Sequence, residues 1–207
     1  MKHIKMMWLE MIFGCLFLAS IIIAFKNLWV NIDFFAYENP KILSKNDTEI
    51  LSKSLEGYLD EVENINDCTA IVVVKDIQGY CLSSKMTNGL KNLGFTQADA
   101  LLEHEYHSFI GVYSGGEVIY QHIGGDELIA YNDWVNNMYI VAKSGTWTHG
   151  NTGKVYIDGV NYSVNVRGIN IIVIDNKNKS IIDSVGFDTH DERIPLYRLE
   201  NGIVKEC

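Results

Sequence analysis

Residues 103–107, which read Glu-His-Glu-Tyr-His, carry the side chains that first suggest acid–base or metal chemistry. If a strand begins at about Glu105, successive side chains alternate between the two faces of the sheet. His104 and His107 would then point in opposite directions, and the helical HExxH spacing that brings two zinc ligands together is absent. The sequence therefore predicts no metal site here.

Other enzyme signatures are missing from the chain. It has no GxSxG nucleophile elbow, no phosphate-binding loop and no paired CxxC spacing for structural zinc. A net charge of -9 and a pI near 5.1 argue against a nucleic-acid surface, which needs clustered Lys and Arg. We expect no cofactor and no nucleic-acid partner.

Trp147 is the best candidate for an exposed aromatic side chain. It lies among the Ser, Gly, Thr and His residues of 144–150, a composition typical of a loop. A ring in such a place can stack on the face of a sugar, whereas most aromatic residues of a sheet pack in its core.

The first 30 residues predict a transmembrane anchor. Residues 6–25 are almost wholly apolar, and an apolar run of about 20 residues spans a bilayer. A cleaved signal peptide is the alternative, although the apolar run continues past the weak cleavage candidate Ala19-Ser20. Lys2 and Lys5 outweigh Lys26, which places the amino terminus in the cytoplasm.

A single-pass membrane protein follows from this interpretation. Residues 1–30 form the anchor, residues 31–45 a juxtamembrane linker, and residues 46–207 one extracytoplasmic domain, since this length suits a single domain. In an oxidising compartment Cys68 and Cys81 are either a disulfide or two separate thiols.

The elements beyond the linker predict an α+β fold, in which a compact mixed β-sheet or sandwich is flanked by a few helices. Helices are expected at 46–64 and 83–93, the second ending at Gly94. The β-branched run within 68–75 predicts a strand that is buried on both faces. Further strands are expected at 107–113, 117–122, 137–143, 153–157, 169–175 and 181–187, with Asp158-Gly159 as a hairpin turn.

Two motifs frame the buried strand at 171–175. Arg167-Gly168-Ile169-Asn170 precedes it, and Phe187-Asp188-Thr189 follows after a polar turn. They resemble the RGxN and FDT motifs of the interleukin-like EMT inducer (ILEI, or PANDER-like) domain. A second block, with Asp76 after a strand and a helix that ends in Leu93-Gly94, is also similar to that family.

The order of the two blocks is reversed relative to the family. The chain is therefore interpreted either as one circularly permuted domain or as parts of two copies, and permutation is favoured because the blocks supply one of each element. The helix at 46–64 would then pack beside the Phe187 strand.

The motif residues also have a structural interpretation. Gly168 permits a close backbone approach, and Asn170 can bond neighbouring backbone. Asp188 and Thr189 can bond the turn that follows their strand. We therefore assign the motif to the fold and seek the ligand site elsewhere.

The resemblance implies that Asp76 and His104 contact sugar, because a glycan-binding member of the family uses an Asp and an Arg at the matching positions. His104 lacks the fixed charge and five donors of Arg, so the match there is partial. Each residue can equally be an exposed polar group at a strand end.

The first hypothesis is a non-catalytic, membrane-anchored ILEI-like domain that binds glycan or assists surface-polysaccharide assembly. One alternative is a protein-interaction module that docks on a membrane partner. A second is a carbohydrate-active enzyme with paired carboxylates.

Overall fold

The computed structural model describes residues 49–78, 82–103 and 106–207. The predicted anchor and linker, Cys81 and His104 lie outside these ranges. Within them, no helix is long and apolar enough to cross a membrane. The elements are α2 (Leu55–Glu63), β1 (Cys68–Lys75), β2 (Ile77–Gln78), α3 (Ser84–Asn92), the 3-10 helix η2 (Ala98–Leu102), β3 (Tyr106–Ser114), β4 (Glu117–Gly124), β5 (Leu128–Val135), β6 (Met138–Gly145), β7 (Thr152–Ile157), β8 (Val160–Asn161), β9 (Gly168–Asp175), β10 (Ser180–Asp188), β11 (Leu196–Glu200) and β12 (Ile203–Glu206).

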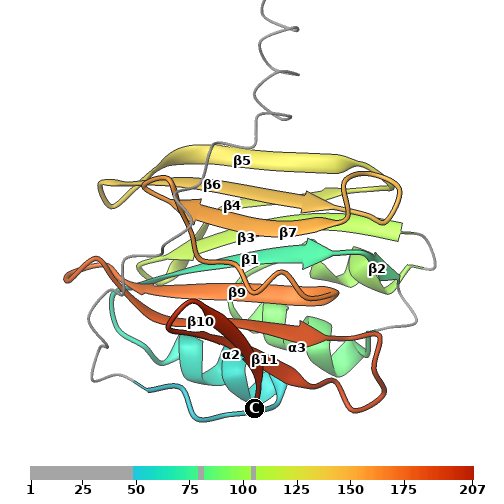
Figure 1. The fold of residues 1–207 in the computed structure, drawn as a ribbon, viewed down its shortest axis with the longest axis horizontal. Helices are drawn as coiled ribbons and strands as arrows, with labels where there is room; N and C mark the ends of the chain where they lie inside the picture. The colour runs from blue at the N-terminus through green and yellow to red at the C-terminus, as the bar shows by residue number, and fades with distance from the viewer. Residues whose placement is uncertain (1–48, 79–81, 104–105) are drawn as a thin grey trace, which may run out of the picture. The chain divides into compact units, whose positions relative to one another are not determined.

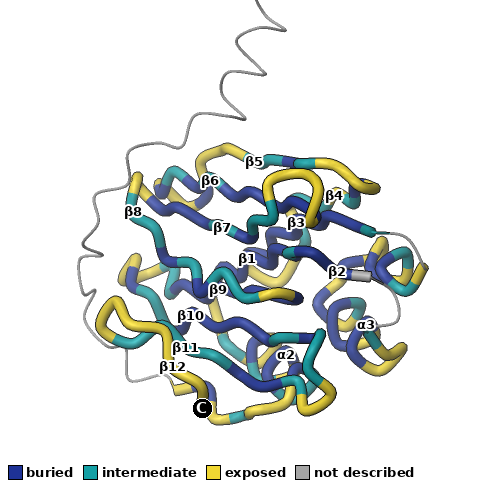
Figure 2. The backbone as a smooth tube through the Cα atoms, turned by 45° about the vertical axis from the view of Figure 1, so that its right-hand side comes forward, coloured by how far each residue is buried: buried dark blue, intermediate teal, exposed yellow. Residues whose placement is uncertain are grey.

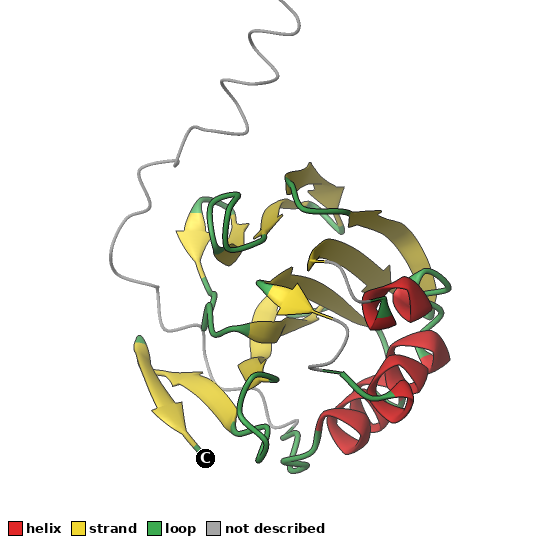
Figure 3. Ribbon diagram, turned by 90° about the vertical axis from the view of Figure 1, so that its right-hand side faces the viewer, coloured by secondary structure: helices red, strands yellow, loops and turns green. Residues whose placement is uncertain are grey.

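β1 is the central strand of a mixed sheet that curls into a half-barrel, as Figures 1 and 3 show. One edge of β1 pairs antiparallel with β9 along its whole length. The other edge pairs antiparallel with β3 and then meets β6 in parallel at a single pair, Lys75 and Gly145. Because β3 and β6 share this edge, the sheet divides there into two layers.

The half-barrel stays open between β4 and β5. Among the described strands, β4 pairs only with β3, and β5 pairs only with β6. The rings of Tyr120 and Tyr131 bridge the two strands, with centroids 4.5 Å apart. Burial raises the pKa of Tyr131 to about 12, because a phenolate is poorly solvated there.

β1 and β9 separate two hydrophobic cores. Val72 and Val74 of β1 face a core that also contains α2 and α3, whereas Ile71 and Val73 face the core inside the half-barrel. Figure 2 shows β1 as buried along most of its length. The prediction of a strand buried on both faces is confirmed, and it explains why the run carries no polar alternation.

The predicted helix at 46–64 is wrong over residues 49–54, and residues 46–48 lie outside the described ranges. The helix begins at Leu55, where the Ser54 side chain caps the N–H of Gly57 at 3.2 Å. The Glu61 carboxylate accepts the N–H groups of Leu51 and Ser52 at 2.8 and 2.9 Å. These bonds hold the preceding segment against the helix in a non-helical conformation.

The helix α2 packs beside the strand that ends in the Phe-Asp-Thr motif. The ring of Tyr58 meets Phe187 edge to face, with centroids 5.7 Å apart. Tyr58 also donates to the carboxylate of Asp183, which accepts from Arg198 of β11 at 3.1 Å. The amino-terminal helix of the described domain and the carboxyl-terminal strands thus form one core.

The other predicted elements are largely confirmed. Helix α3 lies where it was expected, with Ser83 as its cap and Gly94 at a φ of +96° just beyond its end. The Asp158-Gly159 turn has positive φ at both residues, as the predicted hairpin requires. The α+β prediction holds in its coarser form, a mixed sheet covered by a few helices.

The strands β2, β5, β11 and β12 were missed. In β5, Ile129, Tyr131 and Val135 face the core of the half-barrel, but the intervening Leu128 and Ala130 are not polar and Asn132, Asp133 and Trp134 are exposed, so the sequence shows no clear alternation. β11 and β12 form a hairpin across Asn201-Gly202, whose φ angles are +53° and +77°. An Asn-Gly turn is a strong hairpin signal, so this pair was readable in the sequence.

Candidate functional site

Several strands begin or end beside the last residue of β1. Lys75 pairs with Gly168 of β9 on one side and with Gly145 of β6 on the other. β10 ends and β7 begins at the same level. We define the Asp76 end of the sheet as Lys75, Asp76, His107, residues 146–154, residues 167–168 and residues 188–190.

Asp76 joins three segments of this end. Its carboxylate accepts the N–H of Trp147 at 3.1 Å, and its carbonyl accepts a hydrogen bond from Nε2 of His190. Its own N–H donates to the carbonyl of Gly145 at 3.4 Å. The residue has a φ of +51° and is only 6% exposed. Asp tolerates this left-handed conformation better than most residues.

Trp147 lies in a loop that is held by hydrogen bonds to two carboxylates, those of Asp76 and Asp126. Besides the bond to Asp76, the loop is held by Asp126, whose Oδ1 accepts from the hydroxyls of Thr146 and Thr148. These hydrogen bonds lower the pKa of Asp126 below its usual value. The side chain of Trp147 is 65% exposed. An aromatic surface is therefore presented to solvent from a positioned backbone.

The first motif shapes the backbone next to this loop. Gly168 has a φ of +104°, and a Cβ there would lie 2.4 Å from the carbonyl oxygen of Phe187. The fully buried Asn170 accepts from the N–H of Val166 at 3.0 Å and donates to its carbonyl at 2.9 Å. Arg167 pairs with Asp188 at 3.3 Å.

The second motif lies against the first. Phe187 is part of the core with α2, and Asp188 accepts the N–H of His190 at 3.1 Å. Thr189 is 5% exposed, and its hydroxyl makes no hydrogen bond within the described residues. The Thr189 hydroxyl thus does not make the turn bond that the sequence suggested.

His104, the second predicted sugar contact, lies outside the described residues. His107 is buried at the start of β3 and pairs with Ile77, the residue after Asp76. Its Nδ1 is 3.4 Å from the carbonyl of Gly124. Asp76 and Trp147 are therefore the two predicted ligand-binding residues that the structure brings into direct contact.

Unpaired polar atoms concentrate at this end. In the part of the chain that the structure describes, four buried side-chain polar atoms have no hydrogen-bond partner, and they belong to His107, Asn151, Thr152 and Thr189. Each such atom costs roughly 1–3 kcal/mol of stability. Buried polar atoms without a hydrogen-bond partner are expected at functional sites, where residues are selected for function at the expense of local stability.

Sequence reasoning missed two supports of the site. These supports are Asp126 and His190. Asp126 reaches Thr146, which is 20 positions along the chain, and His190 reaches Asp76, which is 114 positions away. No local pattern connects such residues.

Cys68 is buried at the start of β1. Cys68 forms no disulfide with another cysteine of the described ranges, and burial raises the pKa of its thiol to about 11. Because Cys81 lies outside the described residues, a disulfide between the two stays a prediction. No group of three or more potential metal ligands gathers within the described ranges.

The chain was compared with family models, curated proteins and solved structures, and none of them matches it.

Proposed function

We propose that this protein is a non-catalytic carbohydrate-binding domain whose site is the Asp76 end of the sheet. The observation that carries the proposal is the contact between Asp76 and Trp147. The almost fully buried Asp76 carboxylate accepts the backbone N–H of Trp147, and this bond holds the backbone of a residue whose aromatic side chain is exposed. Sugars are recognised by stacking on an aromatic ring together with hydrogen bonds from their hydroxyls to nearby polar groups.

The motif resemblance and the amino-terminal sequence extend this proposal. The domain is proposed to be a circularly permuted ILEI-like domain, and the packing of Tyr58 on Phe187 supports that interpretation. The apolar run at 6–25 supports an anchor that holds the domain outside the membrane. In that place the domain would bind glycan or assist surface-polysaccharide assembly.

The test is a glycan array followed by titration of the purified full chain. Trp147→Ala should abolish detectable binding of any glycan that the unmodified chain retains, because the stacking surface is removed. Trp134→Ala is the matched control, since Trp134 is also 65% exposed. Its strand, β5, approaches the Trp147 loop at Leu128, which pairs with Gly145, and Trp134 lies near the opposite end of that strand.

Two results would contradict the proposal. One is the absence of binding to any glycan on the array by the folded chain. The other is equal binding by the unmodified chain and the Trp147→Ala variant.

An interaction module is a second candidate, favoured by the exposed strand β12. This strand is at the edge of the sheet, and its residues Ile203 and Val204 are 61% and 42% exposed. An unpaired edge can receive a strand from a partner. A pull-down from membranes distinguishes the two functions, because a lone glycan-binding domain brings no stoichiometric protein with it.

A further inference from the structure

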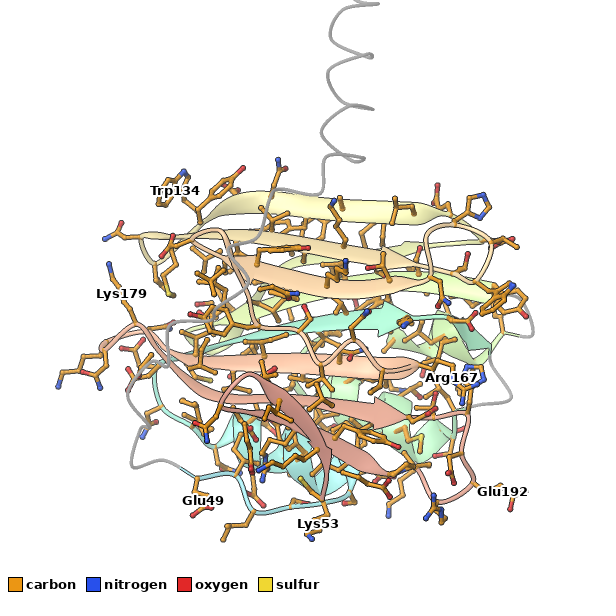
Figure 4. All side chains as sticks on the ribbon, in the orientation of Figure 1. Glu49, Lys53, Trp134, Arg167, Lys179 and Glu192 are labelled. Atoms are coloured by element: carbon orange, nitrogen blue, oxygen red, sulfur yellow. The ribbon has the colours of Figure 1, made fainter. Side chains whose placement is uncertain are left out.

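Three basic residues gather at the Asp76 end: Lys75 of β1, Lys154 of β7 and Arg167, which directly precedes β9. Lys75 ends β1 and pairs with Gly168, the residue after Arg167. A Cβ at Gly153, the residue before Lys154, would lie 3.1 Å from the Cβ of Lys75. Figure 4 shows Arg167 at this end, away from Lys179 and Trp134. Gly153 thus permits a close approach of β7 to Lys75, whereas Gly168 permits a close approach of the Phe187-Asp188-Thr189 segment.

The two lysines lack ionic partners. In the described part of the chain, no carboxylate lies within 4.0 Å of the ammonium of Lys75 or of Lys154. The Lys75 ammonium donates to the carbonyl of Asn165 at 3.0 Å. An ammonium group has three donors, so the capacity of Lys75 is only partly used.

The neighbouring carboxylates are already engaged. Asp188 pairs with Arg167 and accepts an N–H, and Asp76 accepts the N–H of Trp147. Burial lowers the pKa of Lys75, and the nearby charges of Arg167 and Lys154 lower it further, against an opposing effect of Asp76. A chain with a net charge of -9 thus keeps two incompletely compensated ammonium groups together.

We propose that Lys75 and Lys154, with Arg167 beside them, form an anion subsite, so that the sugar bound at the Asp76 end carries a carboxylate or a phosphate group. This inference rests on the proposed carbohydrate function and names the ligand class: acidic glycans. The ring of Trp147 binds the sugar face, and the ammonium groups neutralise the acidic substituent. Charge-assisted hydrogen bonds of this kind are about twice as strong as neutral ones.

The test compares three probes that differ only in the substituent at one position: glucose, glucuronate and glucose 6-phosphate. Calorimetric titration of the purified full chain at low salt should show that at least one acidic probe binds about tenfold more tightly than glucose. The two acidic probes distinguish a carboxylate ligand from a phosphate ligand. The advantage should shrink as the salt concentration rises, because salt screens partly exposed charges.

Two variants and one control assign the effect to the lysines. Lys154→Gln should remove most of the preference for the acidic probe and leave glucose binding unchanged. Lys75→Met keeps the packed stem while removing the charge, and it should act in the same direction. Lys179→Gln is the control, because Lys179 is an exposed lysine at the opposite end of the sheet, and it should retain the full preference.

The outcomes separate the two proposals. Glucose binding that equals or exceeds the binding of both acidic probes overturns the anion subsite and leaves the carbohydrate function standing. An acidic preference that persists in Lys154→Gln, with Lys75→Met equally unaffected, also overturns the subsite. If neither glucose nor any acidic or neutral glycan binds, the carbohydrate function itself fails.

Discussion

Asp76 and Asp158 occupy opposite ends of the sheet in nearly the same conformation. Both have a φ of +51°, and each carboxylate accepts the backbone N–H of an aromatic residue. For Asp76 the donor is Trp147 at 3.1 Å, and for Asp158 it is Tyr139 at 2.8 Å. Asp158 is exposed, whereas Asp76 is buried. Asp76 also bonds Gly145 and His190, whereas the N–H of Asp158 donates back to the carbonyl of Tyr139.

The two ends also differ in how completely their buried polar side chains are hydrogen-bonded. At the Asp158 end, Thr69, Ser114 and Asn136 bond one another, with distances of 2.7 to 3.3 Å. All four unpaired buried atoms of the described residues lie at the other end. Since each end has an equally exposed tryptophan, exposure of an aromatic ring alone does not indicate a site. The buried carboxylate and the unpaired polar atoms make the difference.

Among the variants that test this comparison, Gly168→Ala should lower the stability of the protein most. The new Cβ would collide with backbone atoms at a positive φ, so the free energy of unfolding should fall by roughly 3 to 5 kcal/mol. The control is Gly115→Ala in the β3–β4 turn, where φ is +61° but no atom lies within 4 Å. It should cost only about 1 kcal/mol. Urea unfolding of the full chain measures both, and equal losses would contradict the steric explanation.

Asp76→Ala and Asp158→Ala should rank next. Both lose one hydrogen bond and place Ala at a positive φ, which costs about 1–2 kcal/mol. Asp76→Ala should cost about 1–2 kcal/mol more, because the N–H of Trp147 then loses its partner in a partly buried place.

Asp76→Asn and Asp158→Asn are the matching conservative variants. Asn tolerates the left-handed conformation and keeps an acceptor oxygen, so each should recover most of the lost stability. Unfolding curves of the four variants decide the point. A larger loss from Asp158→Ala than from Asp76→Ala would reverse the comparison.

The smallest effect should be a pH response of the Trp147 loop. The pKa of Asp126 is lowered in the folded protein, so its contribution is fully present above the unfolded pKa of about 4 and is lost as the pH falls through the folded value. The fluorine signal of 5-fluorotryptophan at position 147 should therefore shift in acid below about pH 4. The signal of Trp134 is the internal control.

Asp126→Asn checks the origin of this response. The variant keeps an acceptor for the threonine hydroxyls but cannot titrate, so the acid-dependent shift of the Trp147 signal should disappear. A shift that persists would assign the response to another group.

Local patterns predicted much of the fold and little of the site. The β-branched run of β1, the cap of α3 and the Asp158-Gly159 turn are properties of consecutive residues, and short stretches of sequence report them. The exposure expected for Trp147 has the same origin, since a Ser, Thr and Gly context indicates a loop.

The supports of the site could not be predicted because they depend on registers between distant strands. The parallel pair of Lys75 and Gly145 places Asp76 beside the Trp147 loop, and a shift of one residue would turn the side chains of that strand to the other face. Asp126 and His190 are brought there by the same registers. No pattern within β1 specifies which strand will share its edge with β3.

The gap between β4 and β5 has a consequence for motion. Backbone hydrogen bonds tie β4 to β3 and β5 to β6, whereas the contact between Tyr120 and Tyr131 spans the gap. An aromatic pair is worth about 0.5–1.5 kcal/mol beyond the area it buries, far less than a strand ladder. The two layers can therefore separate at this side while each keeps its own ladder, and the amide hydrogens on the outer edges of β4 and β5 exchange with solvent long before those of β1.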